Sequence, residues 1–284
     1  MTKAEQKLLE RLPEELLIDS VKAPVIADWK PGREFVVVDN RIRLILAPPV
    51  DVASVSVNND MVEKKLLYDG VDLKMTPGGD SVAVVKFVID GNIYEFNTGK
   101  NIESALREMT SLDVPMIVDC DVVEQCRKLL VGRHLFTATS LWYDKGGETV
   151  KGRKYWPVTI IDVVPGNMVF PISVIFDSGN GSVHSMYMNL HKKRAAGVES
   201  RTFGALFSIA DPRIKYAHIS DEVWQLIQSG DVRNGMTKEE CKLSLGNPTD
   251  VEAGHDWNST IDIWRYKDGA FLRFEDGLLV NFRR

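Results

Sequence analysis

Residue types that could do chemistry are scattered along this chain. Asp119 and Asp121 flank a cysteine, a spacing that could pair a general acid with a general base. Because both stand where a helix is predicted to begin, we favour helix capping and solvation instead. No histidine lies three or four positions from another metal ligand on a convincing helix. The histidines are His134, His184, His191, His218 and His255. We therefore expect no metal, no cofactor and no enzymatic activity.

The thiols and the glycine-rich stretch give no stronger signal. Cys120 and Cys126 are too far apart for a zinc knuckle and lack companion ligands. With Cys241 they make an odd count, which fits three reduced thiols and also fits one disulfide plus a spare thiol. We favour ordinary buried thiols. Residues 178–182 lack the lysine of a phosphate-binding loop and lie between predicted strands, so we interpret them as a hairpin tip.

Large aromatic side chains are the better candidates for function. Trp142 and Tyr143 lead into a polar loop that returns at Tyr155 and Trp156, so four rings can converge at one end of a β module. Exposed rings beside a groove suit peptide binding, because they offer a large contact area at low entropic cost. The alternative is that half of these rings fill the core of the module. Two further candidates for partner binding are Trp257 and Trp264.

Composition limits the classes of protein that this chain can belong to. It has 284 residues, 44% of them hydrophobic, and a net charge of −5, which suits a globular chain of two or three domains. The acidic balance argues against nucleic-acid binding, because phosphate recognition depends on a basic surface. The one basic cluster, residues 191–194, is typical of a solvated linker. No apolar run is long enough for a transmembrane segment.

The C-terminal region predicts a pair of short helices. Thr237 can accept the backbone N–H of Glu240, whose carboxylate can reach back to the Thr237 N–H in a capping box. Gly246 ends this helix after about two turns. Upstream, Ser220 can cap a second helix that ends at Gly230.

Downstream of the helices the hydrophobic period changes to alternation. The pattern predicts three strands, at residues 261–264, 272–274 and 278–283, separated by Asp-Gly turns. One face of this meander must be covered, and the helix pair is the available cover. The alternating apolar residues are Ile261, Ile263, Leu272, Phe274, Leu278, Val280 and Phe282.

These motifs resemble a known family. The run from Trp224 to Thr237, the Leu-Gly-Asn-Pro stop at 245–248 and the Phe-Glu-Asp-Gly hairpin at 274–277 are similar to the SmpA/OmlA family of small outer-membrane lipoproteins, the BamE-like fold. The resemblance covers only the C-terminal domain. It implies a domain with no known catalytic residues that scaffolds outer-membrane protein assembly, and the same fold occurs in secreted inhibitors of β-lactamase. Cys241 stands where the family usually has valine, a tolerable replacement because a free thiol packs as a small hydrophobe.

The first two-thirds of the chain are mostly short strands and contain a predicted repeat. A Gly-Arg pair heads a strand at residues 32–33 and again at 132–133. A strand, a Pro-Gly turn, a second strand and a glycine turn follow at 71–92, and the same order recurs at 159–180. The pattern predicts two copies of one β-rich module.

Helical lead-ins precede both copies. The apolar period predicts them at Thr2–Leu17 and Asp121–Leu130, with a further short helix at Ile102–Met109. Short strands without a long helix between them suit a small closed barrel. The order of strands and loops weakly resembles tandem bacterial Src-homology-3-like barrels. The alternative is one larger β-sandwich.

We therefore predict a multidomain chain that is mainly β with a final α+β domain. The predicted parts are a β-rich module with an N-terminal helix at 1–112, a Src-homology-3-like module at 113–197, a linker at 198–218, and a BamE-like domain at 219–284 that combines the helix pair with a three-stranded antiparallel meander.

The leading functional hypothesis is a non-enzymatic protein–protein interaction scaffold or assembly adaptor, with other proteins or peptides as partners. The alternatives are binding of cell-wall peptide or glycan, with peptidoglycan as the ligand, and inhibition of an enzyme. Residues 1–17 have neither the apolar core of a signal peptide nor a cysteine for lipidation, so the sequence as it stands predicts a cytoplasmic protein. Removal of a signal ahead of Met1 would instead indicate the periplasm or outer membrane of a bacterium.

Overall fold

The computed structural model describes residues 12–48, 60–76, 78–190, 201–256 and 259–284. Strands account for 38% and helices for 24% of the structure, which confirms the predicted mainly β, multidomain class. The chain forms two compact units. Unit 1 comprises Met1–Arg133, Ile160–Phe176 and Ser185–Phe203, and unit 2 comprises His134–Thr159, Asp177–His184 and Gly204–Arg284.

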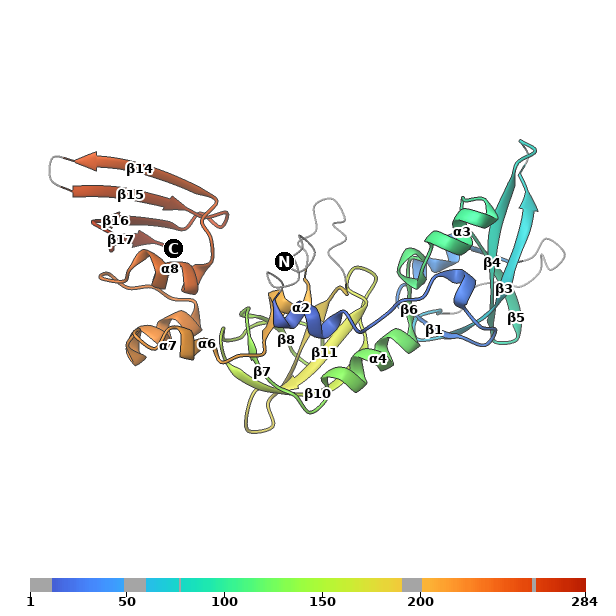
Figure 1. Cartoon of the computed structure of the whole chain (residues 1–284), viewed down its shortest axis with the longest axis horizontal. Coiled ribbons are helices and arrows are strands. Elements are labelled where there is room, and N and C mark those ends of the chain that lie inside the picture. Colours follow the sequence, from blue (N-terminus) through green and yellow to red (C-terminus); the bar gives the residue numbers. More distant parts are fainter. Residues whose placement is uncertain (1–11, 49–59, 77, 191–200, 257–258) are drawn as a thin grey trace, which may run out of the picture. The chain divides into compact units, whose positions relative to one another are not determined.

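Unit 1 contains a six-stranded sheet with the order β2-β5-β4-β3-β1-β6 (Figure 1). Its strands are β1 (Glu34–Val37), β2 (Leu46–Ala47), β3 (Lys65–Met75), β4 (Ser81–Ile89), β5 (Asn92–Asn97) and β6 (Ile117–Asp119). The sheet encloses a core in which Phe35, Leu66 and Phe87 are fully buried. Partly buried Ile102 and Leu106 of a neighbouring helix pack against that core.

Helices in unit 1 follow the predicted apolar periods. The prediction at Ile102–Met109 is confirmed as α3 (Ile102–Glu108), and the one at Asp121–Leu130 as α4 (Cys120–Leu130). Residues 1–11 of the predicted N-terminal helix lie outside the described residues, and α2 (Pro13–Ile18) occupies its end. Short 3-10 helices are η1 (Ile26–Asp28), η2 (Asn40–Leu44) and η4 (Ser111–Asp113).

A second, seven-stranded sheet has the order β13-β7-β10-β11-β12-β8-β9. Its strands are β7 (His134–Thr137), β8 (Leu141–Tyr143), β9 (Thr149–Lys151), β10 (Pro157–Pro165), β11 (Ile172–Asp177), β12 (Val183–Met188) and β13 (Phe207–Ser208). The glycine-rich residues 178–182 join β11 to β12, and the Ser178 N–H donates to the Ser182 carbonyl at 2.9 Å. The predicted hairpin tip is therefore confirmed.

The two larger sheets share one strand order, as the predicted repeat requires. Reading the second sheet from β9, strands β8-β12-β11-β10-β7-β13 correspond to β2-β5-β4-β3-β1-β6, and β9 is an addition. The correspondence extends to single hydrogen bonds. The Gly32 N–H donates to the Tyr68 carbonyl at 2.7 Å, and the Gly132 N–H donates to the Ile160 carbonyl at 2.9 Å. Both glycines have a positive φ, near 86° and 83°, which only glycine adopts freely.

The C-terminal part of unit 2 packs a helix pair on one face of a four-stranded antiparallel sheet with the order β14-β15-β16-β17 (Figure 1). The Thr237 capping box is present, with the Thr237 N–H 2.7 Å from Glu240 Oε2. Trp224, Ile227 and Cys241 of the helices are buried in one cluster with side chains of the sheet. The elements are α5 (Phe203–Leu206), α6 (Pro212–Lys215), α7 (Asp221–Ser229), α8 (Lys238–Leu245), β14 (Asp250–Asp256), β15 (Ser259–Arg265), β16 (Phe271–Glu275) and β17 (Leu278–Arg283).

The predicted three-stranded meander is wrong in strand number. Strands β15, β16 and β17 match the prediction, but β14 (Asp250–Asp256) adds a fourth strand that pairs with β15 along its whole length. The segment was missed because its side chains are mostly small or charged and every one described on it is exposed. Pairing with β15, rather than a buried apolar face, therefore makes it a strand.

The alternation in the first part of the last strand also points to the wrong face. Leu279 is 1% exposed, whereas Leu278 is 47% exposed and Val280 is more than one-third exposed. A register shift opposite Arg273 and Phe274 displaces the pattern, and the Leu279 N–H donates to the Met236 carbonyl at 2.8 Å. Beyond the shift, Phe282 pairs with buried Leu272 and lies on the expected face. A β-bulge of this kind moves side chains between faces without changing the apolar pattern of the sequence.

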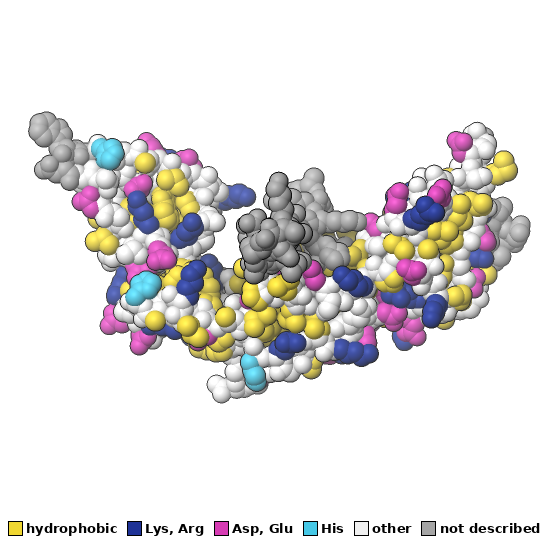
Figure 2. Space-filling view, viewed as in Figure 1, with side chains coloured by type: hydrophobic (Ala, Val, Ile, Leu, Met, Phe, Trp, Pro, Cys, Tyr) yellow, Lys and Arg dark blue, Asp and Glu magenta, His cyan; other side chains and the backbone are white. Residues whose placement is uncertain are grey.

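The described surface carries charges of both signs. On the face drawn in Figure 2, Lys and Arg side chains are interspersed with Asp and Glu, and hydrophobic side chains gather in several places. Within the part of the chain that the structure describes, none of the helices has the length and apolar character of a membrane span.

Candidate partner-binding site

Trp142, the first predicted aromatic candidate, belongs to the core. Its side chain lies in β8 and is 4% exposed. The indole N–H donates to the Thr139 carbonyl at 3.0 Å, and the indole ring lies 5.2 Å from the His184 ring. A Cβ at Gly152 would lie 2.0 Å from the indole, so only glycine leaves room for the ring at this position. Burial therefore removes Trp142 from any contact surface.

Trp156 is half-buried and is held by polar groups. Its indole N–H donates to the Ser178 carbonyl at 2.9 Å, and the Arg153 guanidinium lies 4.5 Å from the ring centroid. The Ser178 hydroxyl lies 3.2 Å from His184 Nδ1, which links the surroundings of Trp156 to those of Trp142. These two rings therefore lie close to a common pair of residues, Ser178 and His184. Tyr143, also half-buried, lies opposite Thr149 in the β8–β9 pair.

Tyr155 turns to a different set of neighbours. Its ring stacks on Trp224 of α7, with the ring centroids 5.4 Å apart and an interplanar angle of 26°. The backbone of Tyr155 has φ of 54°, which is rare for a residue with a large side chain. Burial, with a smaller contribution from Tyr216, raises the pKa of Tyr155.

Thr137 fixes the backbone that holds Tyr155 in this conformation. The Thr137 side chain is fully buried, its hydroxyl donates to the Arg153 carbonyl at 2.6 Å, and the same hydroxyl accepts from the Trp156 N–H at 3.1 Å. The Thr137 backbone carbonyl accepts the Tyr155 N–H. Because this buried hydroxyl both donates and accepts a hydrogen bond, it can hold the adjacent backbone in a conformation that is unfavourable by itself.

The last two predicted candidates offer no exposed ring in the described structure. Trp264 lies in β15, is 8% exposed, and packs on Phe274 with the ring centroids 4.7 Å apart. It is a core residue of the C-terminal sheet. Trp257 lies outside the described residues.

A joint within unit 2 ties the segment 151–156 to the ends of α7 and α8. The Lys154 N–H donates to the Gln228 carbonyl at 2.9 Å, and the Gln228 side-chain amide donates to the Tyr155 carbonyl at 3.2 Å. The Lys154 ammonium donates to the Ser244 carbonyl at 2.5 Å. A cation suits this position because the C-terminal end of a helix carries a partial negative charge. Burial lowers the pKa of Lys154, and the nearby Arg284 charge acts in the same direction.

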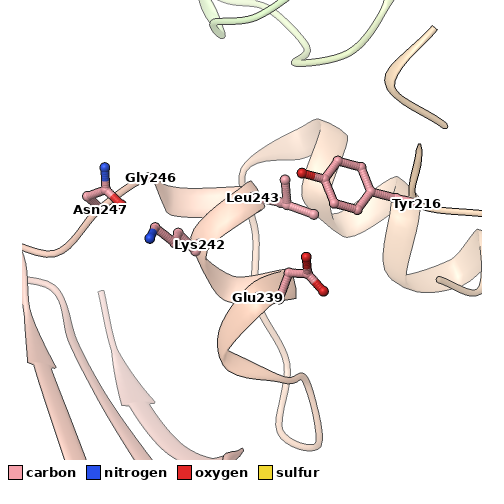
Figure 3. Close-up of a pocket in the computed structure, with 6 residues that line it drawn as sticks. All are labelled: Tyr216, Glu239, Lys242, Leu243, Gly246 and Asn247. Carbon is pink, nitrogen blue, oxygen red and sulfur yellow. The ribbon is translucent and has the colours of Figure 1, made fainter. Parts of the chain in front are cut away.

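The aromatic contacts continue from this joint to a pocket. The Trp224 ring lies 6.2 Å from the Tyr216 ring, and the Arg213 guanidinium lies 5.0 Å from the Trp224 centroid. Tyr216 in turn lines a pocket of about 400 Å³ on α8 (Figure 3). The lining residues are Tyr216, Glu239, Lys242, Leu243, Gly246 and Asn247.

The pocket combines an apolar floor with charges of both signs. Figure 3 shows Leu243 between Tyr216 on one side and Lys242 with Asn247 on the other, and the Glu239 carboxylate beside them. Glu239 Oε2 lies 3.7 Å from His218 Nε2. Among the described residues, no hydrogen bond or ion pair engages the Lys242 ammonium, so this group is open to a ligand.

The two carboxylates considered as a general acid and base, Asp119 and Asp121, make structural contacts. Asp119 caps α4, as predicted, by accepting the Asp121 N–H at 3.1 Å. Its carboxylate is also buried and lies 2.8 Å from the Arg33 guanidinium, so the expectation that it is solvated is wrong. Asp121 has an exposed side chain and pairs with the same guanidinium at 2.8 Å.

The cysteines are free thiols in the structure, and Cys120 is only partly buried, which departs from the expectation of buried thiols. Cys126 and Cys241 are buried, and burial raises the pKa of each to about 12. Such thiols are poor nucleophiles because the thiolate is the reactive form. Within the described ranges, no group of three His, Cys, Asp or Glu side chains is placed to hold a metal ion.

Sequence reasoning missed the residues that form the pocket. Tyr216 falls in the segment predicted as a linker, and Lys242 and Asn247 appeared only as ordinary helix and turn residues. A usable signal was Tyr216 itself, a large aromatic side chain within the segment predicted as a linker. Comparison with protein-family models, with curated proteins and with solved structures found no match for this chain.

Proposed function

We propose that this chain is a non-enzymatic protein–protein interaction scaffold, in which unit 2 presents a pocket to a partner protein. The pocket on α8 carries the proposal: it is open, it has an aromatic and aliphatic floor, and its rim holds an ammonium and a carboxylate. Interfaces concentrate binding energy where a desolvated apolar centre is surrounded by polar groups. The joint supports this function because it holds α7 and α8 in place before a partner arrives, which lowers the entropic cost of binding.

We also propose that the C-terminal fold is BamE-like and that the two larger sheets are Src-homology-3-like modules. A helix pair on one face of an antiparallel meander supports the first assignment, although β14 adds a strand to the arrangement that the resemblance implies. The shared strand order of the two larger sheets supports the second. Both assignments favour interaction rather than catalysis, since each family works mainly by binding.

Affinity capture followed by reconstitution tests the scaffold function. The immobilised full chain is exposed to an extract of the source cells, and retained proteins are compared with those held by an unrelated protein of similar size and net charge. We expect at least one protein to be retained specifically and, once purified, to form a complex of fixed stoichiometry with the full chain by size-exclusion chromatography with light scattering. If no purified candidate forms such a complex at micromolar concentration, the proposal is refuted.

A further inference from the structure

Four backbone carbonyls at the end of α8 already accept hydrogen bonds from within the protein. The Lys154 ammonium donates to the Leu243 and Ser244 carbonyls, the Gly246 N–H donates to the Lys242 carbonyl, and the Tyr266 hydroxyl donates to the Gly246 carbonyl at 3.2 Å. Recognition in the pocket therefore falls mainly to side chains. This separates the pocket from the helix-terminus sites that bind ions through exposed backbone groups.

The side chains of the pocket divide into an apolar part and two opposite charges. Tyr216 and Leu243 form the apolar part, and both also pack against the buried cluster of the C-terminal core, which keeps them in place. Lys242 and Asn247 lie together at one side, whereas Glu239 lies nearer Tyr216 (Figure 3). A ligand that matches this arrangement carries an apolar body with a negative group and a positive group on different sides of it.

The size of the pocket suits more than a single side chain. Its volume of about 400 Å³ falls in the lower part of the range of roughly 300–1,000 Å³ that is usual for sites of drug-sized ligands. An aromatic side chain together with the backbone on either side of it would occupy such a space. The Asn247 side chain is exposed and can both donate to and accept from a peptide backbone.

We propose that the pocket binds a peptide segment of the partner protein in which an aromatic residue stands between one acidic and one basic residue. The acidic side chain pairs with the Lys242 ammonium, the basic side chain pairs with the Glu239 carboxylate, and the aromatic ring lies on Tyr216 and Leu243. This inference rests on the proposed scaffold function and names the chemistry of the segment that the scaffold recognises. Charge complementarity of this kind sets orientation and specificity more than affinity.

A peptide titration of the full chain tests the proposal. The probes are acetyl-Gly-Asp-Trp-Lys-Gly-amide and acetyl-Gly-Lys-Trp-Asp-Gly-amide, which cover both orders of charge. Acetyl-Gly-Ser-Trp-Ser-Gly-amide keeps only the ring, and acetyl-Gly-Asp-Gly-Lys-Gly-amide keeps only the charges. Amide chemical shifts of the isotopically labelled protein are followed by NMR. We expect one charged order to bind best and to shift amides of α8 and of Tyr216.

Single substitutions separate the charge contacts from the apolar floor. Lys242→Gln and Glu239→Gln should each weaken the preferred peptide about two- to fivefold, the range for one exposed ion pair, and leave the Ser-Trp-Ser peptide unchanged. Lys267→Gln and Glu148→Gln are the matched controls, because both side chains are exposed in unit 2 and neither lines the pocket. The double variant Glu239→Lys with Lys242→Glu should reverse the preference between the two charged orders.

Two results would overturn the peptide assignment. One is the absence of shifts at the pocket amides with every peptide at millimolar concentration. The other is equal binding of all the tryptophan peptides by the wild type and by both single variants. Failure here is distinct from failure of the scaffold function: a captured partner that binds Lys242→Gln and Glu239→Gln as tightly as the wild type rules out the pocket as its site while the scaffold function stands.

Discussion

Replacing Tyr155 by alanine and, separately, by glycine tests the joint that links the segment 151–156 to α7. Both changes remove the ring that stacks on Trp224. The two replacements differ in how easily they adopt the positive φ of 54° that the backbone has at position 155. At an ordinary strand position glycine is the worse replacement, by roughly 0.5–1 kcal/mol, because it loses more conformational freedom on folding. At this position the order should be reversed.

The magnitude follows from two terms. Removing a fully buried large ring costs about 3–5 kcal/mol, and Tyr155 is half-buried, so we expect a loss of about 2 kcal/mol for the alanine variant. Left-handed backbone costs a residue with a Cβ about 1–2 kcal/mol. Glycine avoids this strain but loses more conformational entropy on folding, which offsets part of the gain. We therefore expect the glycine variant to be more stable than the alanine variant by about 0.5–1 kcal/mol.

Hydrogen exchange measured by mass spectrometry is the appropriate assay, since it reports local opening without assuming that a multidomain chain unfolds in one step. Amides of α7 and α8 should exchange about 30-fold faster in Tyr155→Ala than in the wild type, because 1.4 kcal/mol corresponds to a factor of about ten. In Tyr155→Gly the same amides should exchange a few-fold more slowly than in the alanine variant.

The control is Ala253→Gly, at a strand position paired with Asp262 and without a positive φ, where glycine should destabilise in the ordinary way. Unchanged exchange in α7 and α8 for Tyr155→Ala would show that the ring does not fasten the joint. A glycine variant less stable than the alanine variant would show that the backbone of Tyr155 is not strained.

Three further predictions concern the supports of the site. Gly152→Ala should destabilise unit 2 by about 1–3 kcal/mol or more, because the added Cβ would lie 2.0 Å from the Trp142 ring. The loss would appear as a lower urea midpoint, and an unchanged midpoint would refute the close fit. Thr237→Ala should cost about 1 kcal/mol by the loss of its cap, with faster exchange of α8 amides, whereas Thr237→Ser should retain most of the protection. The thiol of Cys241 has its pKa raised to about 12 by burial from an ordinary value of 9.0, so the unfolded chain releases this proton first and stability falls as pH rises between these values. At pH ~10.5 this term amounts to about 2 kcal/mol, so Cys241→Val should lose less stability than the wild type between pH 8 and 10.5 in urea titrations; parallel curves would contradict the assignment.

Local features of the C-terminal region could be predicted from the sequence because each depends on neighbours in the chain. The capping box of Thr237 and Glu240 and the positive φ of 70° at Gly230 are fixed by residues a few positions apart. The repeat of the β modules was also predictable, since glycine turns recur at matching positions. Strand number was not: β14 has no apolar period, and its pairing with β15 exists only because that strand lies beside it.

The fates of the aromatic residues show why the site itself could not be predicted. Trp142, Tyr155 and Trp156 lie within one short stretch, yet one is buried in the core, one stacks on a helix far along the chain and one is held by a neighbouring turn. The sequence indicates only that an aromatic ring is present and can provide a large contact area. Its exposure depends on which distant surface meets it, which is a property of packing.

By itself, the sequence determined the class of the fold, the repeat and the helix ends, because these follow from composition and from interactions along a few residues. Only the tertiary structure decided which face of β17 is buried, that Tyr155 adopts a strained backbone to reach Trp224, and that Tyr216 and Lys242 share a pocket. The physical reason is that these outcomes depend on contacts between segments far apart in the chain, and such contacts leave no period or spacing in the sequence.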